Sequence, residues 1–263
     1  MHQLVATRGG FATFRPMVQR CLKWCEYYEC ASTTTRPLFP RLPVRSLPPN
    51  LVEAAEAARC RTVTLLPQPP LLQAGEKAAL DDILFQLHAI ALGDRSAPQT
   101  PLASVVDDLE HQLLDKLAER KKVMLLMADP IDVVYCAILQ AIHICVFHTT
   151  AFVRREIALF RTFVIDLKRT LNVPRMVEVW KTVASAESLL WVLFVGWATA
   201  SQLQGDSPGA IEDATWIIEH FFHVLDVLEL REEEELLEVL RVFPWTDQAY
   251  SAPCKVLWDV HTG

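Results

Sequence analysis

The stretch Glu187–Gln202, ESLLWVLFVGWATASQ, determines the fold that we expect for this chain. From Leu189 to Ala198 every residue is apolar or glycine, so a helix here lacks the polar face that a surface helix shows. Its length and its Leu, Ala and Gly content argue against a strand. We therefore predict a helix that is buried on nearly all sides. Gly196 would let a neighbouring helix approach closely, with large aromatic side chains filling the space around it.

Such a helix must be surrounded by other helices, because a wholly apolar surface is unstable in water. It is too short to span a bilayer, since ten apolar residues rise only ~15 Å against a hydrocarbon core of roughly 30 Å. We expect no segment to reach transmembrane length and no membrane partner. The chain has 263 residues, of which 51% are hydrophobic, so a sizeable core is available. The predicted fold is all-α, a single large irregular helical bundle around the central helix at about 187–202.

Charge is unevenly distributed along the chain, whose formal net charge is −7. Residues 1–62 hold 9 Lys and Arg and 4 Asp and Glu, a net +5, and the remaining residues hold 16 and 28, a net −12. The acidic part would repel nucleic-acid phosphates, so we do not expect it to bind DNA. The 7 cysteines are odd in number and scattered. Without a signal peptide, this pattern indicates reduced thiols.

The first 75 residues differ in composition from the rest. Residues 1–25 are basic, which is typical either of a mitochondrial transit peptide or of an ordinary basic N-terminus. Five prolines between residues 36 and 50 predict an extended connector, and Pro67, Pro69 and Pro70 predict a second one. We therefore divide the chain into a basic, Pro-rich N-terminal extension with short helices, 1–75, and an all-helical regulatory domain, 76–263.

Apolar periodicity and helix start and stop signals predict the other helices. We expect Asn50 to be an N-cap, Gly93 to end a helix, and Thr100–Pro101, Asp129–Pro130 and Ser207–Pro208 to begin one each. Asp107 and Asp108 near one helix start suit the helix dipole. One predicted helix begins at Pro101 and has Lys121 and Lys122 near its end, and another, Phe11–Tyr28, is interrupted early by Pro16. The others are Asn50–Arg59, Glu76–Leu92, Ile131–Phe152, Arg154–Leu171, Arg175–Ala184, Gly209–Leu230 and Glu232–Phe243.

Few residues suggest catalytic chemistry. Gly205–Gly209 matches the serine-hydrolase elbow G-x-S-x-G, but the residue after Ser207 is Pro208, which has no N–H for an oxyanion hole. We interpret Ser207 as a helix cap. No C-x₂-C pair exists in the chain, and there is no P-loop or Rossmann fingerprint. We therefore predict no catalytic site, and the protein is not expected to be an enzyme.

Two groups of histidines and cysteines have the residue types of a metal site. Cys136, His143, Cys145 and His148 point in different directions around one helix, so they cannot converge on one ion. His220 and His223 could meet on one face, but the sequence provides no third ligand. We interpret all of them as ordinary structural residues and predict no metal or cofactor.

The C-terminal half resembles the fungal-specific transcription factor domain, the large regulatory region of fungal binuclear zinc-cluster transcription factors. The central helix has the Leu-Trp, Leu-Phe, Gly and small-residue pattern of that family's late apolar helix. A helix with an early Trp follows, then an acidic-apolar helix and an aromatic–Trp, Pro-Cys and Leu-Trp ending. The similarity covers roughly residues 130–263. The positions that carry it are Leu190, Trp191, Phe194, Gly196, Trp216, Phe243, Trp245, Pro253, Cys254, Leu257 and Trp258.

This resemblance implies a helical regulatory or dimerisation module of a nuclear transcription regulator, with no catalytic residues. It implies protein partners, self-association or a small-molecule effector within the helical core. The chain lacks the six clustered cysteines of the family, which puts direct DNA binding in doubt. The alternative is a helical interaction scaffold unrelated to transcription, in the cytoplasm or the mitochondrion.

For the C-terminus we predict a short helix that starts at Pro253. A helix of that length is unstable alone, so it must dock in a groove between the last full helix, around Leu236, Leu240 and Phe243, and the central helix. Trp258 is expected to supply most of the buried area.

Overall fold

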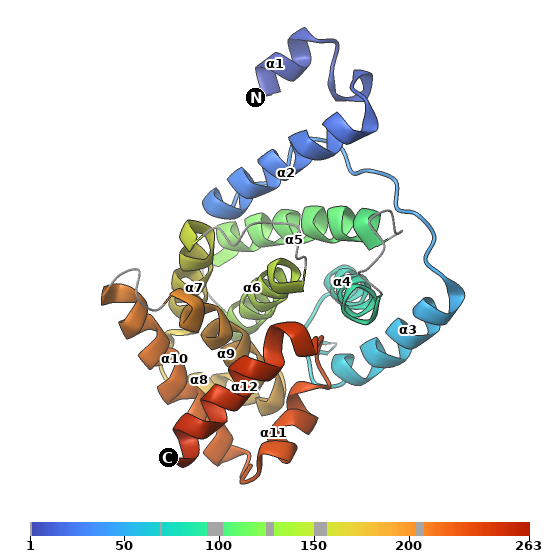
Figure 1. Ribbon diagram of the computed structural model, residues 1–263. Coiled ribbons are helices and arrows are strands. Elements are labelled where there is room, and N and C mark those ends of the chain that lie inside the picture. The colour runs from blue at the N-terminus through green and yellow to red at the C-terminus, as the bar shows by residue number, and fades with distance from the viewer. Residues whose placement is uncertain (1, 69, 94–101, 125–128, 150–156, 204–207) are drawn as a thin grey trace.

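The computed structural model describes residues 2–68, 70–93, 102–124, 129–149, 157–203 and 208–263 (Figure 1). These residues form twelve α-helices and two short 3₁₀ helices, and no strand occurs among them, so the all-α prediction is confirmed. The helices are α1 (His2–Thr7), η1 (Phe11–Thr13), α2 (Pro16–Thr33), α3 (Pro49–Val63), α4 (Ala74–Leu92), α5 (Leu102–Met124), α6 (Pro130–Thr149), α7 (Ile157–Leu171), α8 (Met176–Lys181), α9 (Ala186–Ala200), η2 (Ser201–Leu203), α10 (Pro208–Val227), α11 (Glu233–Leu240) and α12 (Asp247–Thr262).

Helix α9 is the centre of the bundle, as its sequence predicts. Every residue from Ser188 to Ala200 is buried, and α6, α7, α8, α10, α11 and α12 all contact the helix. Its first turn is closed by Ser185, whose side-chain oxygen accepts a hydrogen bond from the backbone N–H of Ser188. The helix is thus fixed at its N-terminus by a local cap and along its length by packing.

The remaining helices enclose this centre in an irregular arrangement (Figure 1). Helices α4, α5 and α6 form one side, with α3 packed against α4 and α2 lying alongside α5. Helices α10, α11 and α12 cover the opposite side of α9. One large core contains residues from α2 and α4 through α12, and a small separate cluster joins Val5, Phe11 and Phe39. Residues on both sides of position 75 therefore contribute to the same large core.

Several helix boundaries differ from prediction, for local reasons. The first long helix runs over Pro16–Thr33, since proline fits the first position of a helix but not its interior. The predicted cap Asn50 is wrong, because Pro48 occupies the capping position and α3 begins at Pro49. Helix α8 begins only at Met176 because Arg175 adopts a left-handed conformation with φ 54°.

Other start and stop signals are confirmed where the structure describes them. Gly93 follows the last residue of α4 and its N–H donates to the Ala89 carbonyl over 3.0 Å. The Asp129 carboxylate accepts a hydrogen bond from the Ile131 N–H at the start of α6. The predicted caps at Thr100 and Ser207 lie outside the described residues.

Helix α6 is long and apolar enough to cross a membrane, judged by length and composition alone. The prediction that no segment reaches that length was therefore wrong. A share of 78% of its most apolar window is buried inside the protein. A buried core helix passes the same test of length and composition, so this one helix is weak support for a membrane span.

Candidate functional site

Four of the eleven residues that carry the family resemblance meet, together with Tyr250, in one aromatic cluster. We use this name for Trp191, Phe194, Phe243, Trp245 and Tyr250. The rings of Trp191 and Phe243 stack with centroids 5.0 Å apart, and those of Phe194 and Trp245 stack at 5.7 Å. Tyr250 packs against both Phe194 and Trp245. Two segments about 50 residues apart in sequence are thus joined between α9 and the start of α12.

Gly196 lies on another side of α9, where α7 and α10 pack. A Cβ atom built on it would lie 2.8 Å from Leu167 Cδ2 and 3.5 Å from Ile217 Cδ1. The first of these distances is shorter than ordinary carbon–carbon contact of about 3.5–4.0 Å. The sequence interpretation of Gly196 as a point of close approach between helices is therefore confirmed.

Trp216 lies outside the aromatic cluster, on α10. Its ring stacks on His220 with centroids 4.0 Å apart, and the ammonium of Lys168 lies 5.9 Å from the ring centroid. The Nδ1 atom of His220 lies 2.8 Å from the carbonyl oxygen of Trp216. The His220 side chain thus contacts a residue of its own helix, whereas the His223 side chain is exposed.

The C-terminal helix differs from its prediction. Helix α12 starts at Asp247, so Pro253 lies inside it and has no N–H to donate to the Ala249 carbonyl. The helix docks against α9 and α11 as expected. Its completely buried side chains, however, are those of Tyr250, Cys254 and Leu257, at successive turns on one face.

Trp258 is only partly buried, and its ring neighbour is His261 at 5.5 Å. The expectation that Trp258 supplies most of the docking area was wrong, because the helix begins six residues earlier than the proline signal indicated. That longer helix places Tyr250, rather than Trp258, against Phe194. Leu257 and Cys254 of the family-like ending are both in the core.

The histidines and cysteines of α6 have structural surroundings. Burial lowers the pKa of His143 to about 3, and its ring packs against Phe147 and Phe163. Burial also raises the pKa of Cys136 and Cys145 to about 12, and the Tyr250 hydroxyl lies 3.0 Å from the Cys145 sulfur. At neutral pH these groups are an uncharged imidazole and two thiols. Neither thiol is the thiolate that nucleophilic catalysis uses.

Metal binding finds no support in the described part of the chain. Within residues 2–68, 70–93, 102–124, 129–149, 157–203 and 208–263, no three His, Cys, Asp or Glu side chains are grouped to hold an ion. His148, which the sequence analysis considered with Cys136, instead has its Nε2 atom 3.1 Å from the Thr199 hydroxyl.

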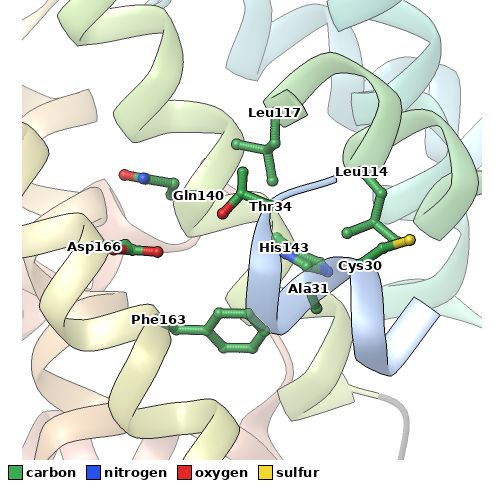
Figure 2. Close-up of a pocket in the computed structure, with 9 residues that line it drawn as sticks. All are labelled: Cys30, Ala31, Thr34, Leu114, Leu117, Gln140, His143, Phe163 and Asp166. Carbon is green, nitrogen blue, oxygen red and sulfur yellow. The ribbon is translucent and has the colours of Figure 1, made fainter. Parts of the chain in front are cut away.

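A small cavity lies where α2 meets α5, α6 and α7 (Figure 2). Its volume is about 30 Å³, which is the space of roughly one water molecule. Two buried polar atoms among its lining residues, Gln140 Oε1 and His143 Nε2, have no hydrogen-bond partner within the protein. A water molecule would satisfy them. The cavity is far below the ~300 Å³ of a typical ligand site, so it does not suit an organic effector.

Sequence reasoning missed a polar network that joins the N-terminal segment to α5. The guanidinium of Arg20 donates to the Asp107 carboxylate over 2.9 Å, and Trp24 Nε1 donates to the same carboxylate over 3.1 Å. Arg41 makes two hydrogen bonds of 2.6 Å to Asp108. Both aspartates are buried. They therefore serve long-range docking, in addition to the helix-dipole role predicted for them.

Only a coarse signal could have pointed to this network, namely the net positive charge of the N-terminal segment beside the net negative charge of the remainder. Such a signal indicates attraction but cannot identify partners.

Comparison of the chain with protein-family models, with curated proteins and with solved structures finds no match in any of the three. Inference about function therefore rests on the residues themselves and on the resemblance stated above.

Proposed function

We propose that this protein is a helical regulatory domain of the fungal-specific transcription factor type, which acts through protein partners and does not catalyse a reaction. The observation that carries the proposal is the aromatic cluster. The two sequence segments that resemble the family pack directly on each other through Trp191 and Phe243 and through Phe194 and Trp245. A chance likeness of two apolar segments would not require them to be in contact.

The chemistry of the described polar groups supports a role without catalysis. The thiols of Cys136, Cys145 and Cys254 are buried, and burial raises the pKa of each to about 12. The thiols of Cys21 and Cys25 are exposed on α2. A nucleophilic cysteine needs a base or a positive environment that lowers its pKa.

Direct DNA binding is not part of the proposal. The chain has no zinc cluster, and much of the basic charge near its N-terminus is engaged within the fold. Arg20 and Arg41 pair with Asp107 and Asp108, and Lys23 is completely buried. We propose that the protein reaches DNA in the nucleus through a partner that binds DNA itself.

The alternative is a helical scaffold in the mitochondrion, which the basic N-terminal residues favour. A transit peptide is removed after import. Removal of residues 1–25 would take away Arg20 and Trp24 and leave the buried Asp107 carboxylate without both partners. The use of these residues inside the fold favours the nuclear proposal. A fluorescent fusion at the C-terminus tests it, because mitochondrial import with loss of the N-terminus would support the scaffold instead.

A reporter assay tests the transcription proposal. The full chain is fused to a heterologous DNA-binding module and measured on a promoter that carries its site. We expect transcription to rise or fall relative to the module alone. A matched fusion with Trp191→Asp, which places a charge in the core, should lose the effect. If the folded parent fusion leaves transcription unchanged in a fungal host, the proposal is wrong.

A further inference from the structure

Helix α2, at the edge of the bundle in Figure 1, displays two cysteine thiols to solvent. Cys21 and Cys25 are both exposed and free, and all 7 cysteines of the chain are among the described residues. Four of the others are buried, and the remaining one, Cys60, is exposed alone on α3. Cysteine is one of the residue types that are most often buried, so an exposed pair on one helix is unusual.

The two thiols of this pair are separated by one helical turn. Residues four apart in an α-helix lie about 40° apart around the axis, with their Cβ atoms roughly 5–6 Å from each other. A disulfide requires Cβ atoms about 3.5–4.5 Å apart, so Cys21 and Cys25 cannot form one without distortion of the helix. An atom that bonds to two sulfurs at once fits the wider separation.

Contacts with α5 and the Pro-rich connector hold this part of α2 in its helical form. The Trp24 indole N–H donates to the Asp107 carboxylate over 3.1 Å, and the Tyr27 hydroxyl donates to the backbone carbonyl of the same residue over 2.9 Å. The Glu26 carboxylate accepts a hydrogen bond of 3.0 Å from the Phe39 N–H. These bonds hold residues between and just beyond the two cysteines. The thiols are therefore one turn apart before any ligand binds, which lowers the entropic cost of binding.

The ligand of this pair must need only two protein groups. Among the described residues, no three His, Cys, Asp or Glu side chains are grouped to hold an ion, so a closed zinc site with four protein ligands is excluded there. Trivalent arsenic bonds strongly to sulfur and keeps one hydroxyl or organic group as its third substituent. Two neighbouring thiols therefore complete its bonding.

We propose that Cys21 and Cys25 form a binding site for trivalent arsenic compounds. Arsenous acid, As(OH)₃, condenses with the two thiols. Two As–S bonds form and two As–O bonds break, and the two thiol protons leave with the two hydroxyl groups as two water molecules. Arsenic stays trivalent, so the step needs no oxidant or reductant. The bridge closes a ring across one turn of α2, and this site does not depend on a role in transcription.

The second As–S bond gives the site its affinity. Once one thiol is bonded to arsenic, the other reacts within the same molecule, and such linkage raises affinity by about 10²–10⁴ over a single contact. Loss of either Cys21 or Cys25 should therefore weaken binding by at least about 100-fold.

Titration of the reduced full chain with phenylarsine oxide tests the proposal. Excess glutathione, a monothiol, is present to displace arsenic from single cysteines, and intact-mass spectrometry counts the bound phenylarsine groups. The parent should hold one such group per chain. Cys21→Ser and Cys25→Ser should each lose it at the same concentration. Cys60→Ser is the matched control, because it removes the exposed thiol on α3 and should leave binding unchanged.

Two double variants test the spacing at a constant number of thiols. Met17 is 71% exposed and precedes Cys21 by one turn of α2. Met17→Cys with Cys25→Ser keeps two thiols one turn apart and should retain the adduct. Met17→Cys with Cys21→Ser separates the two thiols by two turns, about 12 Å along the axis, and should lose it. Circular dichroism melts check that all variants stay folded.

Several results would contradict this site. A folded parent without an adduct, an adduct that survives either single serine substitution, or equal binding by the two double variants would each overturn the proposal. An adduct found only between two chains would also overturn it, because the two thiols of one helix would then not be the site.

Discussion

Helix α9 is in close contact with Leu167 of α7 at Gly196, and this contact allows a quantitative prediction for Gly196→Ala. The new Cβ atom would lie 2.8 Å from Leu167 Cδ2, an overlap of about 0.7 Å relative to ordinary contact. Leu167 is 1% exposed and packed in the core, so it has little room to move. Such overpacking costs about 1–3 kcal/mol. Alanine recovers roughly 0.5–1 kcal/mol because it is the better helix former.

We therefore expect Gly196→Ala to lower the free energy of unfolding by about 0–2.5 kcal/mol, and a double-mutant cycle isolates the overlap. Leu167→Ala alone should cost about 2–5 kcal/mol, because it leaves a cavity. In the Gly196→Ala background the same truncation should cost about 1–3 kcal/mol less, since it also removes the overlap. Urea unfolding followed by circular dichroism measures all four proteins. Additive costs within about 0.5 kcal/mol would refute the close approach as the cause.

Four other expectations concern buried groups. Leu257→Ala should cost about 2–5 kcal/mol in urea unfolding because Leu257 is 0% exposed, and a change within error would mean that α12 does not dock. Burial lowers the pKa of His88 to about 4, so the unfolded chain binds a proton at higher pH than the folded protein does. The free energy of unfolding should therefore fall as the pH drops from about 6.5 to 4. His88→Gln should flatten this part of the plot of stability against pH, and an unaltered plot would contradict the expectation. Burial, aided by the charge of Asp107, raises the pKa of Glu110 to about 8, so folding above pH 4.5 requires proton uptake. The stability of Glu110→Gln should therefore increase relative to that of the parent between about pH 5 and pH 8. A difference in the free energy of unfolding that stays constant over this range would argue against the shift. Arg41→Ala should cost about 1–3 kcal/mol because it removes two hydrogen bonds from the buried Asp108 carboxylate, and stability equal to that of the parent would show that water replaces them.

The sequence by itself determined the fold class and the central helix. A run of apolar residues with no polar face can only be stable when other helices surround it, and the observed α9 is buried over nearly its whole length. Local signals such as Gly93 and Asp129–Pro130 were also predictable, because a cap depends on neighbours within four residues. The absence of a side chain at Gly196 predicted that a helix could approach closely there, although not which helix.

Only the tertiary structure decided which residues far apart in sequence are partners. Asp107 and Asp108 look like ordinary acids at a helix start, but they bind Arg20 and Arg41 from a segment more than 60 residues away. Likewise, nothing in the pattern of α2 shows which of its sides is buried. Its buried side contains Tyr27, Cys30 and Ala31 of the large core, but also the charged Lys23 and Glu26, because the connector backbone supplies carbonyl and N–H groups that bind them. The free energy of such contacts depends on which distant segment of the chain lies against the helix, and the local sequence does not contain that information.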